Sequence, residues 1–510
     1  MDSPPQRRPG MPLEGAMMSP SSPGDRHTAQ ERPNVLWICT DEQRYDTLGC
    51  CGNPFVHTPN LDRLAQEGVL FESCYCQSPI CSPSRASFLT GRYPRTTRCR
   101  QNGQAIPADE LLITRILAEA GYLCGLSGKL HLSPCHPAVC PALERRIDDG
   151  YAEFHWSHHP DAGYWPTNEY VQWLEQKGMR HGRAPFRGSP YVHAGMPAEL
   201  HQTTWCAEKA IEFIEAHAQD RRPWLSSVNT FAPHHPFDPP AEYLERYLDR
   251  LDDLPLPNYA AGELENKPPF QKADHRAAYN EPGNCPFDDM TPEDHRLVRA
   301  AYWATVDLID AQVGRVLNAL ERTGQRRRTI VIFMSDHGEM LGDHGIYLKG
   351  PYFYEPLIRV PLLISWPGKI EHGRRYRALV ELTDLAPTLL DALRLPMPPG
   401  MQGRSFWDMI TRQSPADSHR EDVYCEYYNA LATHTNPTAQ ATMVRTERYK
   451  LAAVHGMDAG ELYDLRDDPG ETHNLWHSPV HEKTKTAMLK RLCDRMAWTV
   501  DPLPLREATY

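Results

Sequence analysis

Short apolar runs recur along the first two thirds of the chain, and polar or ionisable residues follow each of them. Four such runs cover residues 34–40, 122–127, 224–231 and 329–335. Their length and near-continuous apolar character predict strands that are buried on both faces.

Helical spacing of apolar residues separates these runs. It is clearest over residues 61–70, 204–216 and 297–320, where it predicts amphipathic helices. Strands that alternate with helices predict an α/β fold, with a large and mostly parallel sheet flanked by helices.

The pattern changes after about residue 395. Short strands are predicted over residues 423–427, 441–445, 449–454 and 461–464, followed by a helix over residues 481–496. A chain of 510 residues exceeds the roughly 250–300 at which a single core stops growing. We therefore expect a main domain over residues 33–395 and a smaller C-terminal α+β domain with an antiparallel sheet over residues 396–510.

Two segments are expected to lie outside these domain cores. Residues 1–32 are rich in Pro, Ser, Gly, Met and Arg and lack the apolar stretch of a signal peptide, so we expect a disordered tail. Residues 238–292 are dense in Pro, Asn, Asp and Glu and are expected to form an insertion on the surface.

Charge and composition restrict the partners. A net charge of −12 argues against a nucleic-acid partner, because no basic surplus is present to neutralise phosphates. No apolar run approaches the ~20 residues that span a bilayer, so no membrane partner is expected. The sequence leaves homo-oligomer formation open.

The fourteen cysteines do not follow disulfide-framework spacings, and we expect mostly free thiols in a reducing, cytoplasmic compartment. Cys74 with Cys76, or Cys135 with Cys140, would form a zinc pair only with partners that the sequence does not show. We therefore expect no zinc site.

Candidate chemistry begins with the polar residues that follow the predicted strands. Ligands of parallel sheets bind beyond the carboxyl ends of the strands, so these residues are expected along one edge. They are Asp41, Lys129, His131, His234, Asp336 and His337.

The segment 81–92, CSPSRASFLTGR, carries the most specific pattern. Pro83 is expected at the first position of a short helix that ends at Gly91. The positive end of a helix dipole favours an anion, so Cys81 is a candidate low-pKa nucleophile. The alternative is a buried cysteine at a helix cap.

The same segment resembles the signature of the type I, formylglycine-dependent sulfatases of the alkaline phosphatase superfamily. Its fixed positions read Cys-x-Pro-x-Arg followed by x-x-x-Leu-Thr-Gly-Arg, and all are present. The resemblance extends over about residues 33–476. It includes residues 128–131 (GKLH), 232–237 (APHHPF), 335–339 (SDHGE) and 461–464 (ELYD).

This resemblance implies an alkaline-phosphatase-like fold in which residues 33–395 are the catalytic sulfatase domain. It also implies that a formylglycine-generating enzyme oxidises Cys81 to formylglycine, whose hydrate offers one hydroxyl to attack and one to expel the product. The metal ligands it implies are Asp41, Glu42, residue 81, Asp336 and His337. Such a set suits Ca²⁺, with Mn²⁺ or Mg²⁺ as alternatives. Glu42 is a departure, because many relatives have a second Asp there.

The resemblance also implies roles for the remaining site residues. His234, assisted by Lys349, would protonate the leaving alcohol, and His131 would deprotonate the remaining hydroxyl of the hydrate. Arg85 would hold the hydrate, and Lys129 would stabilise developing negative charge. Asn102 would contact the substrate.

The implied activity is hydrolysis of sulfate monoesters. Phosphonate monoester and phosphodiester hydrolases share the fold and the formylglycine, but tend to carry Tyr-x-Thr where this chain has Lys129-x-His131. A non-catalytic pseudo-sulfatase that binds sulfated ligands and a thiol hydrolase with unmodified Cys81 are further alternatives. The leaving group (sugar, aryl or choline-type) stays open. Residues 154–160, with Tyr164 and Trp165, either line its pocket or pack against the sheet.

Overall fold

The computed structural model describes residues 32–508 except for 162–166, 412–416 and 435–437. Residues Pro33–Tyr510 form one compact unit. The predicted disordered tail lies outside the described residues, apart from Arg32, and so do Tyr164 and Trp165.

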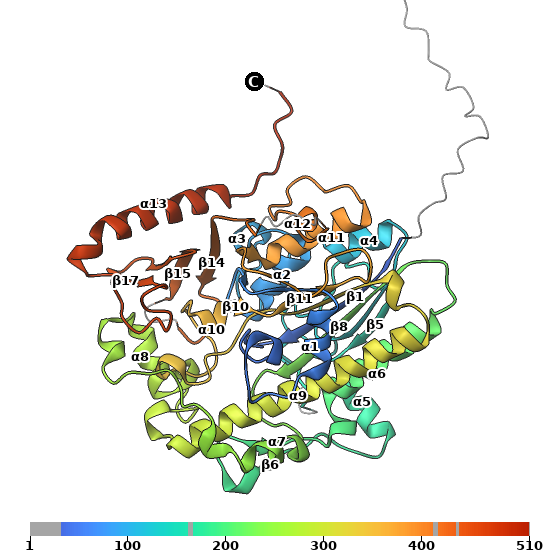
Figure 1. The fold of residues 1–510 in the computed structure, drawn as a ribbon, viewed down its shortest axis with the longest axis horizontal. Coiled ribbons are helices and arrows are strands. Elements are labelled where there is room, and N and C mark those ends of the chain that lie inside the picture. The colour runs from blue at the N-terminus through green and yellow to red at the C-terminus, as the bar shows by residue number, and fades with distance from the viewer. Residues whose placement is uncertain (1–31, 162–166, 412–416, 435–437, 509–510) are drawn as a thin grey trace, which may run out of the picture. The chain divides into compact units, whose positions relative to one another are not determined.

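An eight-stranded sheet forms the centre of this unit (Figure 1). Its strands in spatial order are β12 (Arg374–Tyr376), β2 (Val69–Phe71), β11 (Leu362–Ser365), β9 (Thr329–Ser335), β1 (Asn34–Asp41), β8 (Trp224–Pro233), β4 (Leu123–Gly128) and β5 (Glu153–Trp156). The five strands from β9 to β5 are mutually parallel, and β11 runs antiparallel to both of its neighbours. The four strands predicted from the apolar runs are all present, which confirms the large, mostly parallel sheet.

Helices cover both faces of the sheet because the side chains of a strand alternate between its faces. Val35 and Trp37 of β1 belong to the core on one face, with α2 (Cys81–Thr90), α4 (Ile113–Glu119) and α11 (Leu385–Leu393). Leu36 and Ile38 belong to the core on the other face, with α1 (Pro59–Gln66), α6 (Gln202–Ala216) and α9 (Pro292–Arg322).

The helix predicted over residues 61–70 ends earlier than expected, so its predicted C-terminal end is wrong. Helix α1 stops at Gln66, and strand β2 starts at Val69. Gly68 lies between them, where a Cβ atom would come within 2.2 Å of the Ile364 carbonyl oxygen. Close packing against β11 therefore ends the helix, and the apolar residues after Gly68 enter the sheet instead.

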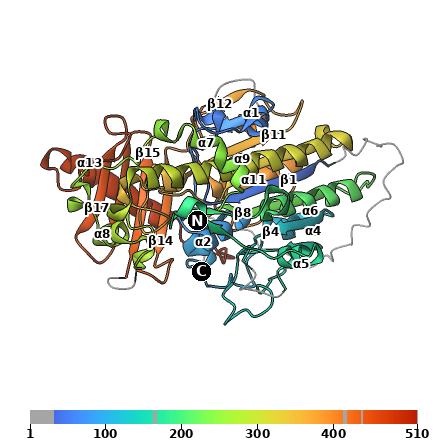
Figure 2. The ribbon, with the colours of Figure 1, turned by 90° about the horizontal axis from the view of Figure 1, so that it is seen from below.

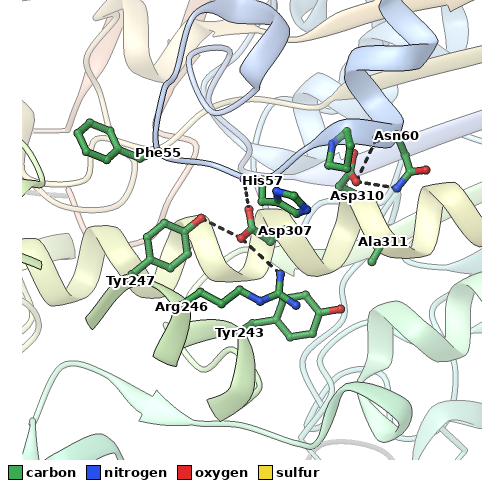
Figure 3. Close-up of a pocket in the computed structure, with 10 residues that line it drawn as sticks. Phe55, His57, Asn60, Tyr243, Arg246, Tyr247, Asp307, Asp310 and Ala311 are labelled. Carbon is green, nitrogen blue, oxygen red and sulfur yellow. Dashed lines mark hydrogen bonds and ion pairs between the residues drawn. The ribbon is translucent and has the colours of Figure 1, made fainter. Parts of the chain in front are cut away.

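Two buried aspartates of α9 anchor the segment that leads into α1 (Figure 3). Asp310 accepts hydrogen bonds from the backbone nitrogens of Asn60 (3.2 Å) and Leu61 (2.7 Å) at the start of α1. Asp307 accepts from the backbone nitrogen of His57 at 2.7 Å and from the hydroxyl of Tyr247 in α7 (Ala241–Leu248) at 2.9 Å. They border a cavity of about 440 Å³.

A second sheet, antiparallel and four-stranded, lies at one end of the main sheet (Figures 1 and 2). Its strands are β14 (Asp422–Tyr428), β15 (Gln440–Thr446), β16 (Tyr449–Val454) and β17 (Ala459–Asp464), and α13 (Glu482–Trp498) packs against β15 and β16. This confirms the small antiparallel domain. Because Cys425 and Met443 on its other face join the core of the main sheet, the boundary at residues 395/396 stays a prediction.

The remaining elements are short. The insertion 238–292 contains α7, α8 (Pro269–Arg276) and 3₁₀ turns. The other helices are α3 (Pro94–Thr97), α5 (Glu169–Gln176), α10 (Glu355–Ile358) and α12 (Trp407–Thr411). The other strands are β3 (Cys74–Tyr75), β6 (Ala184–Pro185), β7 (His193–Ala194), β10 (Arg359–Val360) and β13 (Val380–Glu381).

All fourteen cysteines lie within the described residues, and each is a free thiol. Among the described residues, no helix is long and apolar enough to span a bilayer.

Candidate active site

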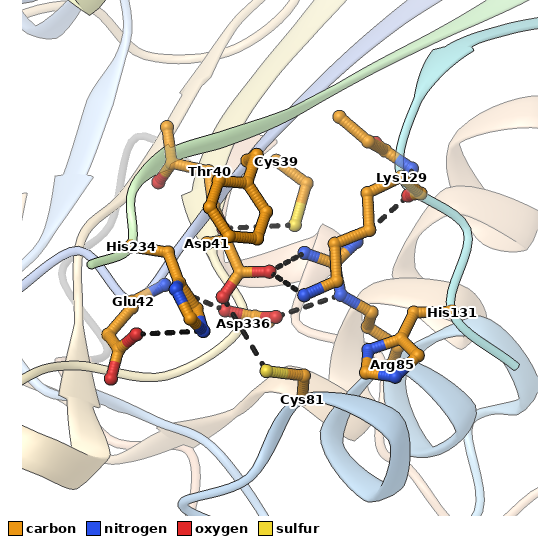
Figure 4. A network of polar contacts seen from close by, with 12 residues as sticks. Cys39, Thr40, Asp41, Glu42, Cys81, Arg85, Lys129, His131, His234 and Asp336 are labelled. Carbon is orange, nitrogen blue, oxygen red and sulfur yellow. Dashed lines mark hydrogen bonds and ion pairs between the residues drawn. The ribbon is translucent and has the colours of Figure 1, made fainter. Parts of the chain in front are cut away.

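Polar residues at the carboxyl ends of β1, β4, β8 and β9 converge on one point (Figure 4). Strand β1 lies between β8 and β9, so Asp41 at its end comes close to Asp336 beyond β9 and to His234 beyond β8. Lys129 follows β4, the next strand along. The parallel register thus brings together residues that are up to three hundred positions apart in sequence.

Helix α2 carries Cys81 into the same point from the face of the sheet. Cys81 itself is the first residue of the helix, so the expectation that Pro83 occupies the first position is wrong, and Pro83 lies third, within the first turn. The side chain of Asn102 accepts a hydrogen bond from the backbone nitrogen of Ser82 at 3.0 Å, which satisfies a free donor of that turn. Gly91 ends the helix with φ 67°.

Four buried residues offer ligand atoms within 4.8 Å of one another: Asp41, Cys81, Asp336 and His337. The Cys81 sulfur lies 3.2 Å from His337 Nε2 and 3.5 Å from Asp41 Oδ1. His337 Nε2 lies 3.8 Å from Asp336 Oδ1. Two carboxylate oxygens, an imidazole and the side chain at position 81 form a donor set that fits a divalent ion.

Arg85 and Lys129 occupy the other oxygens of these carboxylates. Arg85 donates to Asp336 Oδ2 at 2.8 Å and to Asp41 Oδ2 at 3.1 Å, and Lys129 also pairs with Asp41 Oδ2. Burial alone would raise the pKa of Asp41, but Lys129 and Arg85 hold it well below its usual range. Both carboxylates are therefore fixed in orientation, with Oδ1 turned toward Cys81 and His337.

Glu42 is not brought into this group. Its backbone has φ 67°, and its carboxylate lies beside His234 Nε2 (3.3 Å), His235 Nδ1 (3.6 Å) and Lys349 Nζ (3.3 Å). The structure therefore places Glu42 among basic side chains, whereas the resemblance implies a metal ligand.

Glu339 also lies in this site. The sequence pattern did not single it out as a candidate, although it lies in the motif 335–339. It is fully buried, and its Oε1 accepts hydrogen bonds from the backbone nitrogens of Leu341 (3.0 Å) and Leu348 (2.6 Å). Burial and the neighbouring Glu42 raise its pKa well above the usual range. Glu339 is therefore a neutral carboxyl group that can donate a hydrogen bond to Glu42. His235 was also missed, although it lies in the motif 232–237.

The Cys81 thiol lies among positive charges. Lys349 Nζ is 3.1 Å from its sulfur. Burial and Asp41 oppose ionisation, but Lys129, Lys349 and His337 outweigh them and lower the pKa of Cys81. In turn, burial lowers the pKa of His337, yet Asp336 and Cys81 outweigh it and raise that pKa to about 10. Position 81 is thus built to hold a negatively charged or strongly polar atom.

His131 and His234 lie on either side of Lys129 and Cys81. Burial, with Lys129 and Arg85, lowers the pKa of His131 well below its usual range, so this imidazole is uncharged near neutral pH. Burial also lowers the pKa of His234, although Glu42 opposes this shift. His234 Nδ1 lies 2.6 Å from the carbonyl oxygen of His235, which holds the ring with Nε2 toward Glu42.

Comparisons with known proteins agree with this geometry. Residues 33–395 match the family model "Sulfatase", and residues 342–497 match the model "N-sulphoglucosamine sulphohydrolase, C-terminal". An arylsulfatase of Clostridium perfringens is 30% identical over 468 residues, covering 89% of this chain and 92% of the relative. The uncharacterised sulfatase YidJ of Escherichia coli is 31% identical over 482 residues, covering 92% and 88%.

A solved structure, the phosphonate monoester hydrolase of Agrobacterium radiobacter, superposes with a TM-score of 0.79. It is 26% identical, and the match covers 93% of this chain and 97% of that one. The chain belongs to the sulfatase family of the alkaline phosphatase superfamily, and it is an enzyme of that family.

Proposed function

We propose that this protein hydrolyses sulfate monoesters with a formylglycine formed from Cys81 and a divalent metal ion. The observation that carries the proposal is the buried group of Asp41, Cys81, Asp336 and His337 at the start of α2. Its sulfur faces Lys349, and its carboxylates are held by Arg85 and Lys129.

Asp41, Asp336 and His337 would hold the ion together with residue 81. The oxygen-rich set favours Ca²⁺, and Mn²⁺ or Mg²⁺ would also suit it. When bound, the ion would stabilise negative charge on the ester, and the hydrated aldehyde of formylglycine would supply the nucleophilic oxygen. Conversion of Cys81 requires a formylglycine-generating enzyme as partner.

The basic side chains of the chain stabilise the charge that develops on the ester. A unit charge about 4 Å away contributes on the order of 4 kcal/mol at an effective dielectric near 20. Lys129 and Lys349 are buried, and Arg85 is fixed by two carboxylates. Little reorganisation is then needed when charge moves to the leaving oxygen. Asn102 uses its carbonyl oxygen to cap α2, which leaves its Nδ2 to contact the substrate.

Proton transfers follow from the two histidines. An anionic ester beside His234 favours its charged form, so substrate binding would raise its low pKa and let it protonate the leaving alcohol. Lys349, whose pKa is raised by Cys81 and Glu42 in spite of burial, keeps its charge and assists. His131, held neutral, accepts the proton of the remaining hydroxyl at position 81.

A phosphonate monoester hydrolase activity is the second candidate, and the TM-score of 0.79 to such an enzyme favours it. The Lys129-x-His131 element supports sulfate instead. The arylsulfatase and the other sulfatase relative, each about 30% identical over most of the chain, support the same choice. A sugar, aryl or choline-type leaving group is consistent with this proposal.

The test begins with protein co-produced with a formylglycine-generating enzyme. Mass spectrometry of the peptide that contains Cys81 should show the aldehyde. The value of kcat/KM for at least one of an aryl, a sugar and a choline sulfate should then exceed that for a phosphonate monoester by at least ~10-fold. A larger phosphonate value would select the second candidate. An unmodified thiol without esterase activity would favour a ligand-binding pseudo-sulfatase. An unmodified thiol with esterase activity would favour a thiol hydrolase.

A cytoplasmic location is part of the proposal, and the free state of all fourteen cysteines supports it. Homo-oligomer formation stays a prediction, which light scattering would test.

A further inference from the structure

A second buried group of metal-binding side chains lies beside the first and consists of His131, Cys135 and His158. One ring nitrogen of each histidine and the sulfur of Cys135 lie within 4.8 Å of one another. The two imidazole rings meet edge to face, with centroids 4.4 Å apart and an interplanar angle of 83°. All three side chains are buried.

The sheet explains how this group forms. His131 and Cys135 lie in the loop after β4, and His158 lies just after β5. These strands pair in parallel, with Gly128 opposite Trp156, so the two loops leave the sheet together. The spacing of residues along the chain shows no partner for Cys135, because only this strand pairing brings histidines from both loops to it.

Glu144 fixes the loop that carries two of the three ligands. Its carboxylate accepts hydrogen bonds from the backbone nitrogens of His131 (2.9 Å) and Leu132 (3.0 Å), and from Trp156 Nε1 (2.8 Å). Its Oε2 lies 3.7 Å from the Cys135 sulfur. A buried carboxyl group at this distance offers a fourth ligand or compensating charge for a cation, while the nearby Lys129 is paired with Asp41.

One ring nitrogen of His131 is unpaired in the part of the chain that the structure describes. His131 Nδ1 is buried and has no hydrogen-bond partner among the described residues. Burial keeps Cys135 protonated in the absence of metal, and coordination replaces that proton.

We propose that His131, Cys135 and His158 bind Zn²⁺. Two imidazoles and one thiolate match the ligand preference of zinc and differ from the oxygen-rich group at Asp41, which suits a hard ion. On binding, the S–H bond of Cys135 breaks, its proton leaves to solvent, and a sulfur–zinc bond forms. The fourth position is left to Glu144 or to water.

Zinc at this group would inhibit the enzyme. This part rests on the proposed function, in which His131 is the proton acceptor of the second step. A metal ion bound to the ring of His131 occupies the lone pair that would take the proton, and it also fixes the ring in place. The protein would thus have two sites of opposite preference: a hard ion at Asp41 supports turnover, and a borderline ion at Cys135 stops it.

Metal binding is tested by absorption spectroscopy, which needs no enzymatic activity. Co²⁺ serves as the spectroscopic probe for zinc. The protein carries Cys81→Ser, so that the first group has no thiol, and excess Ca²⁺ is present. We expect an intense near-ultraviolet thiolate-to-cobalt band that Zn²⁺ abolishes by displacement. Adding Cys135→Ser should remove the band, and His158→Gln should weaken Co²⁺ binding at least ~10-fold. Adding Cys140→Ser, a thiol outside the group, should leave the band intact.

An absent band, or a band that survives Cys135→Ser, would overturn the site. Inhibition is tested separately on the converted enzyme with Ca²⁺. The Zn²⁺ concentration for half inhibition should rise at least ~10-fold in Cys135→Ser and stay unchanged in Cys140→Ser. If Zn²⁺ inhibits both variants and the wild type equally, the inhibition arises at another site, and the inhibitory role of this group is overturned. A chain without activity would contradict the proposed function, while the cobalt spectrum would still decide the site.

Discussion

The ammonium nitrogen of Lys349 lies 3.1 Å from the sulfur of Cys81, although 268 positions separate the two residues in sequence. Lys349 is buried, and its pKa is raised, so its charge is present at every pH at which the enzyme would work. The same ammonium lies 3.3 Å from Glu42, which links position 81 to His234 and His235.

Lys349→Gln should lower kcat/KM for a sulfate ester by roughly 10²–10³, since a fixed charge beside the reacting atoms is lost. Most of the change should fall on kcat. Steady-state kinetics of the converted enzyme measure it, with the exposed Lys272→Gln as control. A change below ~3-fold would show that Lys349 does not act on the transition state.

The proposed metal ligands can be distinguished from Glu42 by calcium titration. Asp41→Asn and Asp336→Asn should each weaken Ca²⁺ binding by roughly 10- to 100-fold or more, because each removes a charged oxygen from the group. Glu42→Gln should leave Ca²⁺ affinity within ~3-fold and lower kcat, since its carboxylate contacts His234 and Lys349 instead. Isothermal titration measures the affinities. A loss of affinity in Glu42→Gln equal to that in Asp41→Asn would restore Glu42 to the ligand set.

Glu339 offers a matched pair of substitutions. Glu339→Gln preserves the acceptor for Leu341 and Leu348 and can still donate to Glu42, so stability should change by less than ~1 kcal/mol. Glu339→Ala leaves two buried backbone donors unsatisfied and should cost about 2–5 kcal/mol. Urea unfolding of the two variants compares them. Equal losses would contradict a neutral carboxyl group at this position.

Asp307 should make stability depend on pH. Burial raises its pKa from 3.8 to about 7, although hydrogen bonds from His57 and Tyr247 oppose the shift. The folded state therefore keeps a proton that the unfolded chain releases, and stability falls as the pH rises from about 4 to 7. The full shift corresponds to roughly 4 kcal/mol.

Asp307→Asn keeps the acceptor for His57 and cannot ionise, so it should become more stable relative to the wild type as the pH rises over this range. Urea midpoints at several pH values measure the difference, and the exposed Asp249→Asn should track the wild type. Parallel curves for Asp307→Asn and the wild type would show that Asp307 ionises normally.

Several features of the fold could be predicted from local pattern alone. Buried parallel strands are nearly continuous in apolar residues, so β1, β4, β8 and β9 were found within two residues of their ends. The end of α1 could not be predicted in this way. Gly68 packs closely against Ile364 of β11, and this contact depends on a part of the chain far from α1 in sequence. The helix that starts at Cys81 was predicted from its Pro and Gly residues, but the hydrogen bond that Asn102 accepts from its first turn was not.

The sequence by itself determined the class of chemistry. The segment 81–92 and the residues after four strands named a candidate nucleophile, candidate metal ligands and their basic partners, since motif residues and strand ends are local properties. The tertiary structure decided which of these residues meet. It turned Glu42 toward His234, paired it with Glu339 and brought His158 to Cys135. Backbone angles, strand pairing and burial set those contacts, and each depends on parts of the chain that are far apart in sequence.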